Sequence, residues 1–130
     1  MALSVPADLR YADSHEYAGS CSAGVKVGIS AFAVEQLGDI VFVELPAAGS
    51  SLERGTSFGS VESVKAVEDM YAPVSGTVLR CNQAVVDSPE LLQQDPYGEG
   101  WLLEVQPADP AQLNDLMDAA TYSTKVEGAA

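Results

Sequence analysis

The stretch Glu62-Ser63-Val64-Lys65-Ala66-Val67-Glu68-Asp69 places one lysine among small or β-branched neighbours and three carboxylates. The chain has two other lysines, Lys26 in a predicted strand and Lys125 in the C-terminal tail. A lysine ε-amine that is held out into solvent can be acylated by another enzyme. An amide bond would remove the charge of the lysine and attach a long arm. An unmodified surface lysine is the alternative interpretation.

A lipoyl or a biotinyl group can be attached in this way, and the chemistry then resides in the cofactor. The dithiolane of a lipoyl group exchanges between disulfide and dithiol and can hold a carried group on one sulfur. The tether keeps that group at high effective concentration whenever the carrier docks on a partner. Biotin carriers typically place methionines on both sides of the lysine, so Val64 and Ala66 argue against biotin.

Other kinds of site have little support in the sequence. The single histidine, His15, adjoins Ser14, and neighbouring strand residues point to opposite faces, so we interpret it as a packed or rim residue rather than a general base. No HExxH motif, cysteine cluster, EF-hand loop or phosphate-binding loop occurs, so we predict no metal site. We find no catalytic residues and predict a protein that is not an enzyme.

The charge of the chain restricts its partners. Nineteen acidic against six basic residues give a formal net charge of −13, which would repel nucleic acid and anionic membranes. No apolar run approaches the roughly 18 residues of a membrane span. The absence of an Arg- and Ser-rich leader favours a bacterial cytoplasmic protein, although a mature organellar protein would show the same pattern.

The elements around Lys65 are predicted from alternation and turn signals. Alternating or β-rich runs predict strands over Glu16–Cys21, Val25–Ile29, Ile40–Leu45, Ser57–Val64, Met70–Ala72, Thr77–Cys81 and Trp101–Val105. Lys65 then falls at the bend of a hairpin. Two similar β units flank this bend, which predicts two small antiparallel sheets that face each other. The 130 residues fit a single domain over 1–130.

Helix signals are few. Ser30 and Gly38 bracket a short helix over Ala31–Leu37. Ser88 with Pro89 predicts the start of a second short helix. The same signal recurs at Asp109-Pro110, and the apolar spacing of Leu113, Leu116 and Met117 predicts a C-terminal helix from there, packed on the β core.

Several motifs in this order resemble the H-protein family of the glycine cleavage system. They are Asp8–Tyr11, Ser14-His15-Glu16, Val27–Ile29, LGDIVFVELP over Leu37–Pro46, ESVKA over Glu62–Ala66, Pro73–Gly76, and DPYGEGW over Asp95–Trp101. The motifs span nearly the whole chain, and together they are far more specific than ESVKA alone. The resemblance implies a barrel-sandwich hybrid fold of the lipoyl/biotinyl-carrier type, with lipoate attached covalently to Lys65 as N6-lipoyl-lysine.

The resemblance also implies a shuttle role in glycine catabolism and one-carbon metabolism. The lipoyl arm would receive an aminomethyl group from pyridoxal-phosphate-dependent glycine decarboxylase and present it to the tetrahydrofolate-dependent aminomethyltransferase. Dihydrolipoamide dehydrogenase would then reoxidise the dithiol, and lipoate-attaching enzymes would modify the chain. The carrier is expected to be a monomer.

By resemblance, further residues receive roles. Ser14, Glu16 and Asp69 match a cleft that contacts the carried amine, where carboxylates and a hydroxyl can hold a cation. Recognition for lipoylation falls to the neighbours of Lys65, which are Glu62, Ser63, Val64 and Ala66. The family's usual His-Glu-Trp is His15-Glu16-Tyr17 in this chain, and we expect little functional consequence because tyrosine keeps an aromatic surface.

Two further functions stay open at this stage. An H-like protein can serve as a relay that donates lipoyl groups to other lipoyl domains. Alternatively, an unmodified binding module could recognise a basic protein through its acidic face. The latter predicts that partner binding survives Lys65→Arg.

Overall fold

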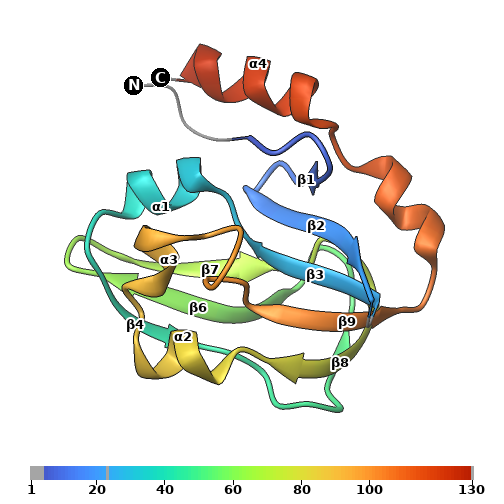
Figure 1. Cartoon of the computed structure of the whole chain (residues 1–130), viewed down its shortest axis with the longest axis horizontal. Helices are drawn as coiled ribbons and strands as arrows, with labels where there is room; N and C mark the ends of the chain where they lie inside the picture. Colours follow the sequence, from blue (N-terminus) through green and yellow to red (C-terminus); the bar gives the residue numbers. More distant parts are fainter. Residues whose placement is uncertain (1–4, 23, 130) are drawn as a thin grey trace.

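The strands form two antiparallel sheets that face each other (Figure 1). The computed structural model describes residues 5–22 and 24–129, with the backbone alone at 127–129. The six-stranded sheet has the order β1 (Arg10–Tyr11), β2 (Glu16–Cys21), β3 (Gly24–Ile29), β9 (Leu103–Pro107), β8 (Gly76–Cys81) and β5 (Ser51–Leu52). The three-stranded sheet has the order β4 (Ile40–Glu44), β6 (Ser57–Ser63) and β7 (Val67–Tyr71). The predicted pair of antiparallel sheets is confirmed.

An apolar core fills the space between the sheets because each strand turns alternate side chains inward. Val61 of β6 is buried and lies opposite Val43 of β4 in the register. These two side chains and Met70 of β7 pack in one cluster with Val27 and Val105 of the larger sheet. Burying side chains of this size contributes roughly 1.5–3 kcal/mol each, so the core fixes the β6–β7 hairpin on the larger sheet.

The helix α1 (Ala31–Leu37) begins and ends where the sequence predicts. The side chain of Ser30 caps it by accepting a hydrogen bond from the backbone N–H of Ala33 at 3.2 Å. Gly38 follows with φ of 79°, a conformation that favours glycine, and its N–H donates to the carbonyl of Val34 at 3.2 Å. Local capping chemistry therefore sets the position of α1 between β3 and β4.

The helix predicted from Ser88 and Pro89 starts at the wrong residue. Asn82 instead caps a helix that the sequence analysis missed, α2 (Gln83–Asp87), by accepting a backbone N–H of its first turn at 3.2 Å. Ser88 ends that helix, and α3 (Leu91–Gln94) begins later without a side-chain cap. Asparagine is as good an N-cap as serine, so the earlier signal determines where the chain turns helical.

The C-terminal segment forms two helices rather than the single predicted one. Asp109 caps a helix as expected, but it is a 3-10 helix over Pro110–Asp115. Met117 does not extend it, because its backbone exchanges hydrogen bonds of 2.8 and 2.9 Å with Tyr11. The helix α4 (Ala119–Ala129) follows this bridge.

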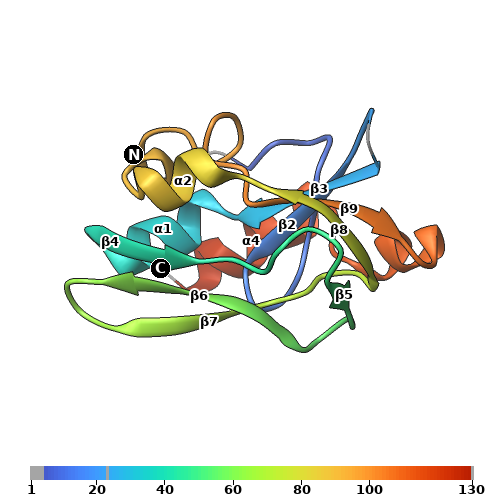
Figure 2. The same ribbon diagram turned by 90° about the horizontal axis from the view of Figure 1, so that it is seen from below.

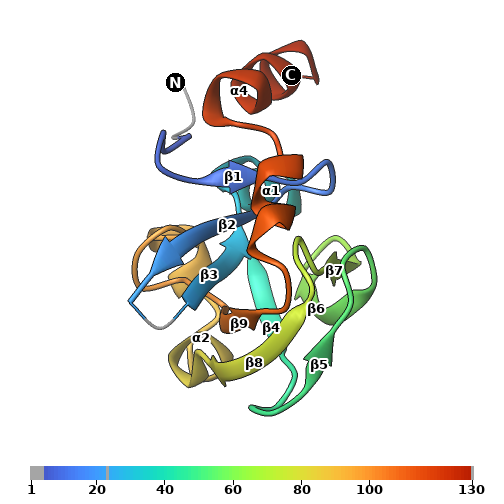
Figure 3. The same ribbon diagram turned by 90° about the vertical axis from the view of Figure 1, so that its right-hand side faces the viewer.

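A second apolar cluster attaches α4 to the body of the protein. Its buried members are Leu9, Tyr11, Tyr17, Phe32, Tyr122 and Val126. The rings of Tyr11 and Tyr122 stack with centroids 4.5 Å apart and planes 7° from parallel. Figures 1 and 3 both show α4 beside β1, on the side of the molecule away from β8. No helix within the described ranges has the length and apolar character needed to cross a bilayer.

Candidate functional site

Lys65 lies at the exposed tip of the β6–β7 hairpin, as the sequence predicts. The antiparallel register pairs Glu62 with Val67, so residues 63–66 make the turn. Figure 2 shows this connection projecting from one end of the molecule beyond the start of β4. The ε-amine is therefore presented where a second protein can approach it.

The backbone of this tip is organised by the hydroxyl of Ser63, a predicted recognition residue. Its Oγ accepts hydrogen bonds from the N–H groups of Lys65 at 3.1 Å and Ala66 at 3.2 Å. The N–H of Ser63 also donates to the carbonyl of Ala66 at 2.8 Å. The side chain of Ser63 is buried and holds the shape of the tip, and its role in recognition for lipoylation stays a prediction.

Ser63→Ala should loosen the tip without unfolding the sheet, because it removes the acceptor of two backbone N–H groups. A lost cap of this kind costs about 1 kcal/mol, which corresponds to about fivefold faster amide exchange at Lys65 and Ala66. Hydrogen exchange followed by NMR measures this. Ser60→Ala, in the same strand, should leave both amides at their wild-type rates, and equal rates in the two variants would refute the role of Ser63.

Two contacts join the tip to the connection between α1 and β4. The N–H of Val64 donates to the carbonyl of Asp39 at 3.0 Å. A Cβ built at Gly38 would lie 3.5 Å from Cε of Lys65, so the lysine stem lies directly beside this glycine. The tip is thus positioned by a segment about 25 residues earlier in the chain as well as by its own strands.

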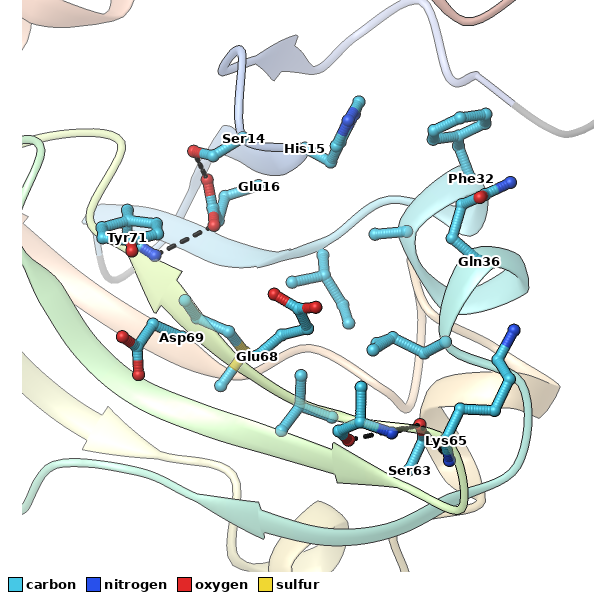
Figure 4. Close-up of a pocket in the computed structure, with 16 residues that line it drawn as sticks. Ser14, His15, Glu16, Phe32, Gln36, Ser63, Lys65, Glu68, Asp69 and Tyr71 are labelled. Carbon is cyan, nitrogen blue, oxygen red and sulfur yellow. Dashed lines mark hydrogen bonds between the residues drawn. The ribbon is translucent and has the colours of Figure 1, made fainter. Parts of the chain in front are cut away.

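A cavity of 390 Å³ extends from Lys65 to the start of β2 (Figure 4). Its walls come from the residues before β2, from α1, and from β6 and β7. The lining includes Lys65 together with all three predicted cleft residues, Ser14, Glu16 and Asp69. Its apolar members are Ile29, Phe32, Ala33, Leu37, Val61, Ala66 and Met70, and its other polar members are His15, Gln36, Ser63, Glu68 and Tyr71.

The carboxylate of Glu16 forms the polar end of this cavity and is almost fully buried, with 2% of the residue exposed. One oxygen accepts a short hydrogen bond from the hydroxyl of Ser14, and the other accepts the N–H of Tyr71 at 2.9 Å. Burial raises the pKa of Glu16, and these hydrogen bonds oppose part of that rise. The carboxylate is desolvated and therefore attracts a cation strongly.

Glu16→Gln should change how stability depends on pH. Because the pKa of Glu16 is raised on folding, the folded state holds this proton more tightly than the unfolded state. The free energy of unfolding of the wild type should therefore fall as pH rises above the unfolded value of about 4.3, up to the raised folded pKa. Glutamine has no proton to lose and lacks this decrease.

Urea unfolding from pH 4 to pH 8 would measure both proteins. The stability of Glu16→Gln relative to wild type should increase with pH across that window and then level off. A difference that stays constant with pH would contradict the raised pKa.

Asp69 and Glu68 lie on opposite faces of β7. Glu68 pairs with the buried Val61, whereas Asp69 pairs with Ser60. In Figure 4 the carboxylate of Glu68 points into the middle of the cavity, and that of Asp69 points away from it. Strand alternation with the apolar Met70 two residues later indicates the inward face for Glu68.

The imidazole of His15 also lines the cavity, as a rim residue. Its Nδ1 lies 2.7 Å from the hydroxyl of Tyr122, and its ring centroid is 4.9 Å from that of Phe32. Burial and the nearby Lys125 lower the pKa of His15, while Asp13 opposes them. Within the described contacts His15 pairs with Tyr122 and not with Ser14, so no serine–histidine pair is formed.

The comparisons with known proteins concern the whole chain. A family model described as Glycine cleavage H-protein matches residues 9–129. The chain belongs to this H-protein family. It is 73% identical over 128 residues to the glycine cleavage system H protein of Synechococcus sp. (strain RCC307), covering 98% of each chain. It is 67% identical over 126 residues to that of Parasynechococcus marenigrum (strain WH8102), covering 97% of this chain and 98% of the relative.

A solved H-protein has the same fold. The crystal structure of a glycine cleavage system H protein from Mycobacterium marinum superimposes with a TM-score of 0.87 at 40% sequence identity, covering 95% of this chain and 99% of that one. The lipoyl-type barrel-sandwich fold is therefore confirmed. Membership of the H-protein family makes the chain a carrier component of the glycine cleavage system.

Proposed function

We propose that this chain carries an aminomethyl group on a lipoyl arm attached to Lys65. The observation that supports this most directly is the placement of Lys65 at an exposed tip, beside a cavity that ends at the buried carboxylate of Glu16. A bound lipoyl group supplies a disulfide that accepts the two electrons and the aminomethyl group left when the carboxyl of glycine departs as carbon dioxide.

The residues of the cavity fit such an arm. Apolar side chains such as Leu37 and Met70 line its length, which suits an aliphatic chain. Glu16 and Ser14 stand at its end, where they would hold a protonated amine by charge and hydrogen bonds. Exclusion of water there would slow premature loss of the amine. Asp69 also lines the cavity, and its carboxylate, which points away from it, would have to rotate inward to become a third contact.

The proposed partners are glycine decarboxylase, the tetrahydrofolate-dependent aminomethyltransferase, dihydrolipoamide dehydrogenase and lipoate-attaching enzymes. The outer face of the small sheet offers a surface to them, since exposed Phe42, Glu62 and Val67 form one cross-strand row next to Lys65. An apolar centre with acidic neighbours suits a partner with a basic rim. We propose that the lipoate-attaching enzyme recognises Glu62, Val64 and Ala66 at this tip. The chain is proposed to be a single-domain, cytoplasmic monomer.

The test is the mass of the chain made with active lipoylation, followed by loading with glycine and the decarboxylase. A lipoyl adduct mapped to Lys65 and a further aminomethyl adduct that depends on glycine are expected. A chain without adduct at Lys65, or one whose adduct never supports glycine decarboxylation, would overturn the proposal. Transfer of the lipoyl group to a second lipoyl domain would indicate the relay function.

A further inference from the structure

The hydroxyl of Tyr122 lies between two walls of the cavity, although no residue of α4 belongs to the described lining. It is 2.7 Å from Nδ1 of His15 and 2.6 Å from Oγ of Ser30. His15 stands between Ser14 and Glu16 before β2, and Ser30 is the cap of α1. One side chain from the C-terminal helix therefore contacts both segments that face the hairpin across the cavity.

We propose that Tyr122 is a positioning residue of this cavity. Its hydroxyl fixes the segment Ser14–Glu16 against the start of α1, so that the C-terminal helix sets the shape of the site without touching its contents. The consequence for a carried amine rests on the proposed function, but the positioning itself does not.

The segment that Tyr122 holds needs external support. His15 has φ of 79°, a conformation that is unfavourable for a residue with a Cβ and persists only where surrounding contacts impose it. The backbone around it is tied by the bond from the N–H of Ser30 to the carbonyl of His15 at 2.9 Å. Tyr122 provides the hydrogen bond to the imidazole. Loss of this hydrogen bond should therefore relax the turn that directs Ser14 and Glu16 toward the cavity.

The donor and the acceptor can be assigned in both hydrogen bonds of the Tyr122 hydroxyl. Burial raises the pKa of Tyr122 to about 12, so its hydroxyl keeps its proton at neutral pH. Burial and Lys125 lower the pKa of His15 by more than Asp13 raises it, so the neutral ring is favoured. A neutral ring lets Ser30 donate to Tyr122 and Tyr122 donate to Nδ1 of His15. Phenylalanine at position 122 would remove both bonds and leave Ser30 and His15 without this link.

The neighbouring Tyr11 offers a matched control. It stacks on Tyr122, both side chains are fully buried, and both belong to the same apolar cluster. The hydroxyl of Tyr11, however, donates to the carbonyl of Pro6 at 2.8 Å, and Tyr11 does not line the cavity. Tyr11→Phe thus deletes the same atom from the same cluster with no effect on the two cavity walls.

The first experiment measures hydrogen exchange in the full chain, which needs neither cofactor nor partner. The amide of Ser30 reports the junction, and amides of β8 serve as the reference for global stability. Tyr122→Phe should speed exchange at Ser30 about tenfold relative to that reference, as expected for two neutral hydrogen bonds. Tyr11→Phe should leave the ratio at the wild-type value. Equal ratios in the two variants would overturn the proposal.

His15→Ala tests the same link from the other side and keeps the proposal open to refutation if Tyr122→Phe does not fold. It removes one of the two bonds and should speed exchange at Ser30 by about threefold. An unchanged rate there would overturn the proposal.

The second experiment follows ammonia release from the aminomethyl-loaded, lipoylated chain. Release should be about tenfold faster in Tyr122→Phe than in wild type, because the amine is less well held, and unchanged in Tyr11→Phe. Failure of the wild type to load would contradict the proposed function while the exchange result stands. Fast exchange at Ser30 with unchanged release would refute the effect of Tyr122 on the carried amine.

Discussion

Lys65→Arg should abolish the carrier function completely while leaving the fold intact. Arginine keeps the positive charge, but its guanidinium stays protonated and is no substitute for the ε-amine in forming the amide bond. Lys65 is exposed, and the turn is held by backbone bonds to Ser63 rather than by the lysine side chain. Intact mass should show no lipoyl adduct, and glycine decarboxylation supported by the variant should fall to the background rate.

Lys26→Arg is the matched control. Lys26 lies in β3 and donates to the carbonyl of Tyr97 at 3.2 Å, away from the cavity. The same substitution there should leave both the adduct and the decarboxylation at wild-type levels. Decarboxylation supported by the Lys65→Arg protein would contradict the carrier function. Partner binding that survives this substitution, in a protein that never carries an adduct, would favour the unmodified binding module.

Gly28→Ala should destabilise the fold strongly, although it adds a single methyl group. A Cβ at Gly28 would lie 2.5 Å from the ring of Tyr17, its direct partner across β2 and β3. That ring is fully buried, and its hydroxyl donates to the carbonyl of Pro96 at 2.7 Å. Moving the ring aside would therefore break this hydrogen bond and disturb the packing around it. Overpacking of this kind costs about 3 kcal/mol, or about 10 °C in melting temperature for a domain of this size.

A double-mutant cycle isolates the clash. In a Tyr17→Leu background the ring is gone, and Gly28→Ala should cost less than about 1 kcal/mol, since alanine is otherwise acceptable in a strand. Calorimetry of the four proteins gives the coupling energy. Equal costs in both backgrounds would mean that Tyr17 is not what excludes a side chain at position 28.

Local signals in the sequence predicted those elements whose ends are set by neighbouring residues. The helix between Ser30 and Gly38 is an example, because both caps act within one turn. The single C-terminal helix was a wrong prediction for the opposite reason. Met117 has the right spacing for that helix, yet its backbone bonds to Tyr11, more than 100 residues earlier, and no local pattern reveals such a bridge.

The candidate site divides in the same way. The position of Lys65 at a hairpin bend follows from turn signals and alternation, and the family motifs indicate Ser14 and Glu16. The inward direction of Glu68 would have followed from extending the strand predicted at Met70 two residues toward the N-terminus. The contact of Tyr122 with the cavity walls depends on the packing of α4, which is decided by the folded chain as a whole.

The bond from Val64 to Asp39 has a consequence for the proposed modification of Lys65. An excised hairpin peptide would contain the residues of β6 and β7, including Ser63, but would lack this anchor and the contact of the lysine stem with Gly38. An enzyme that recognises the geometry of the tip would then act on folded chains and not on nascent or misfolded ones. Under the proposed lipoylation, acylation of Lys65 would then mark a chain that has completed its folding.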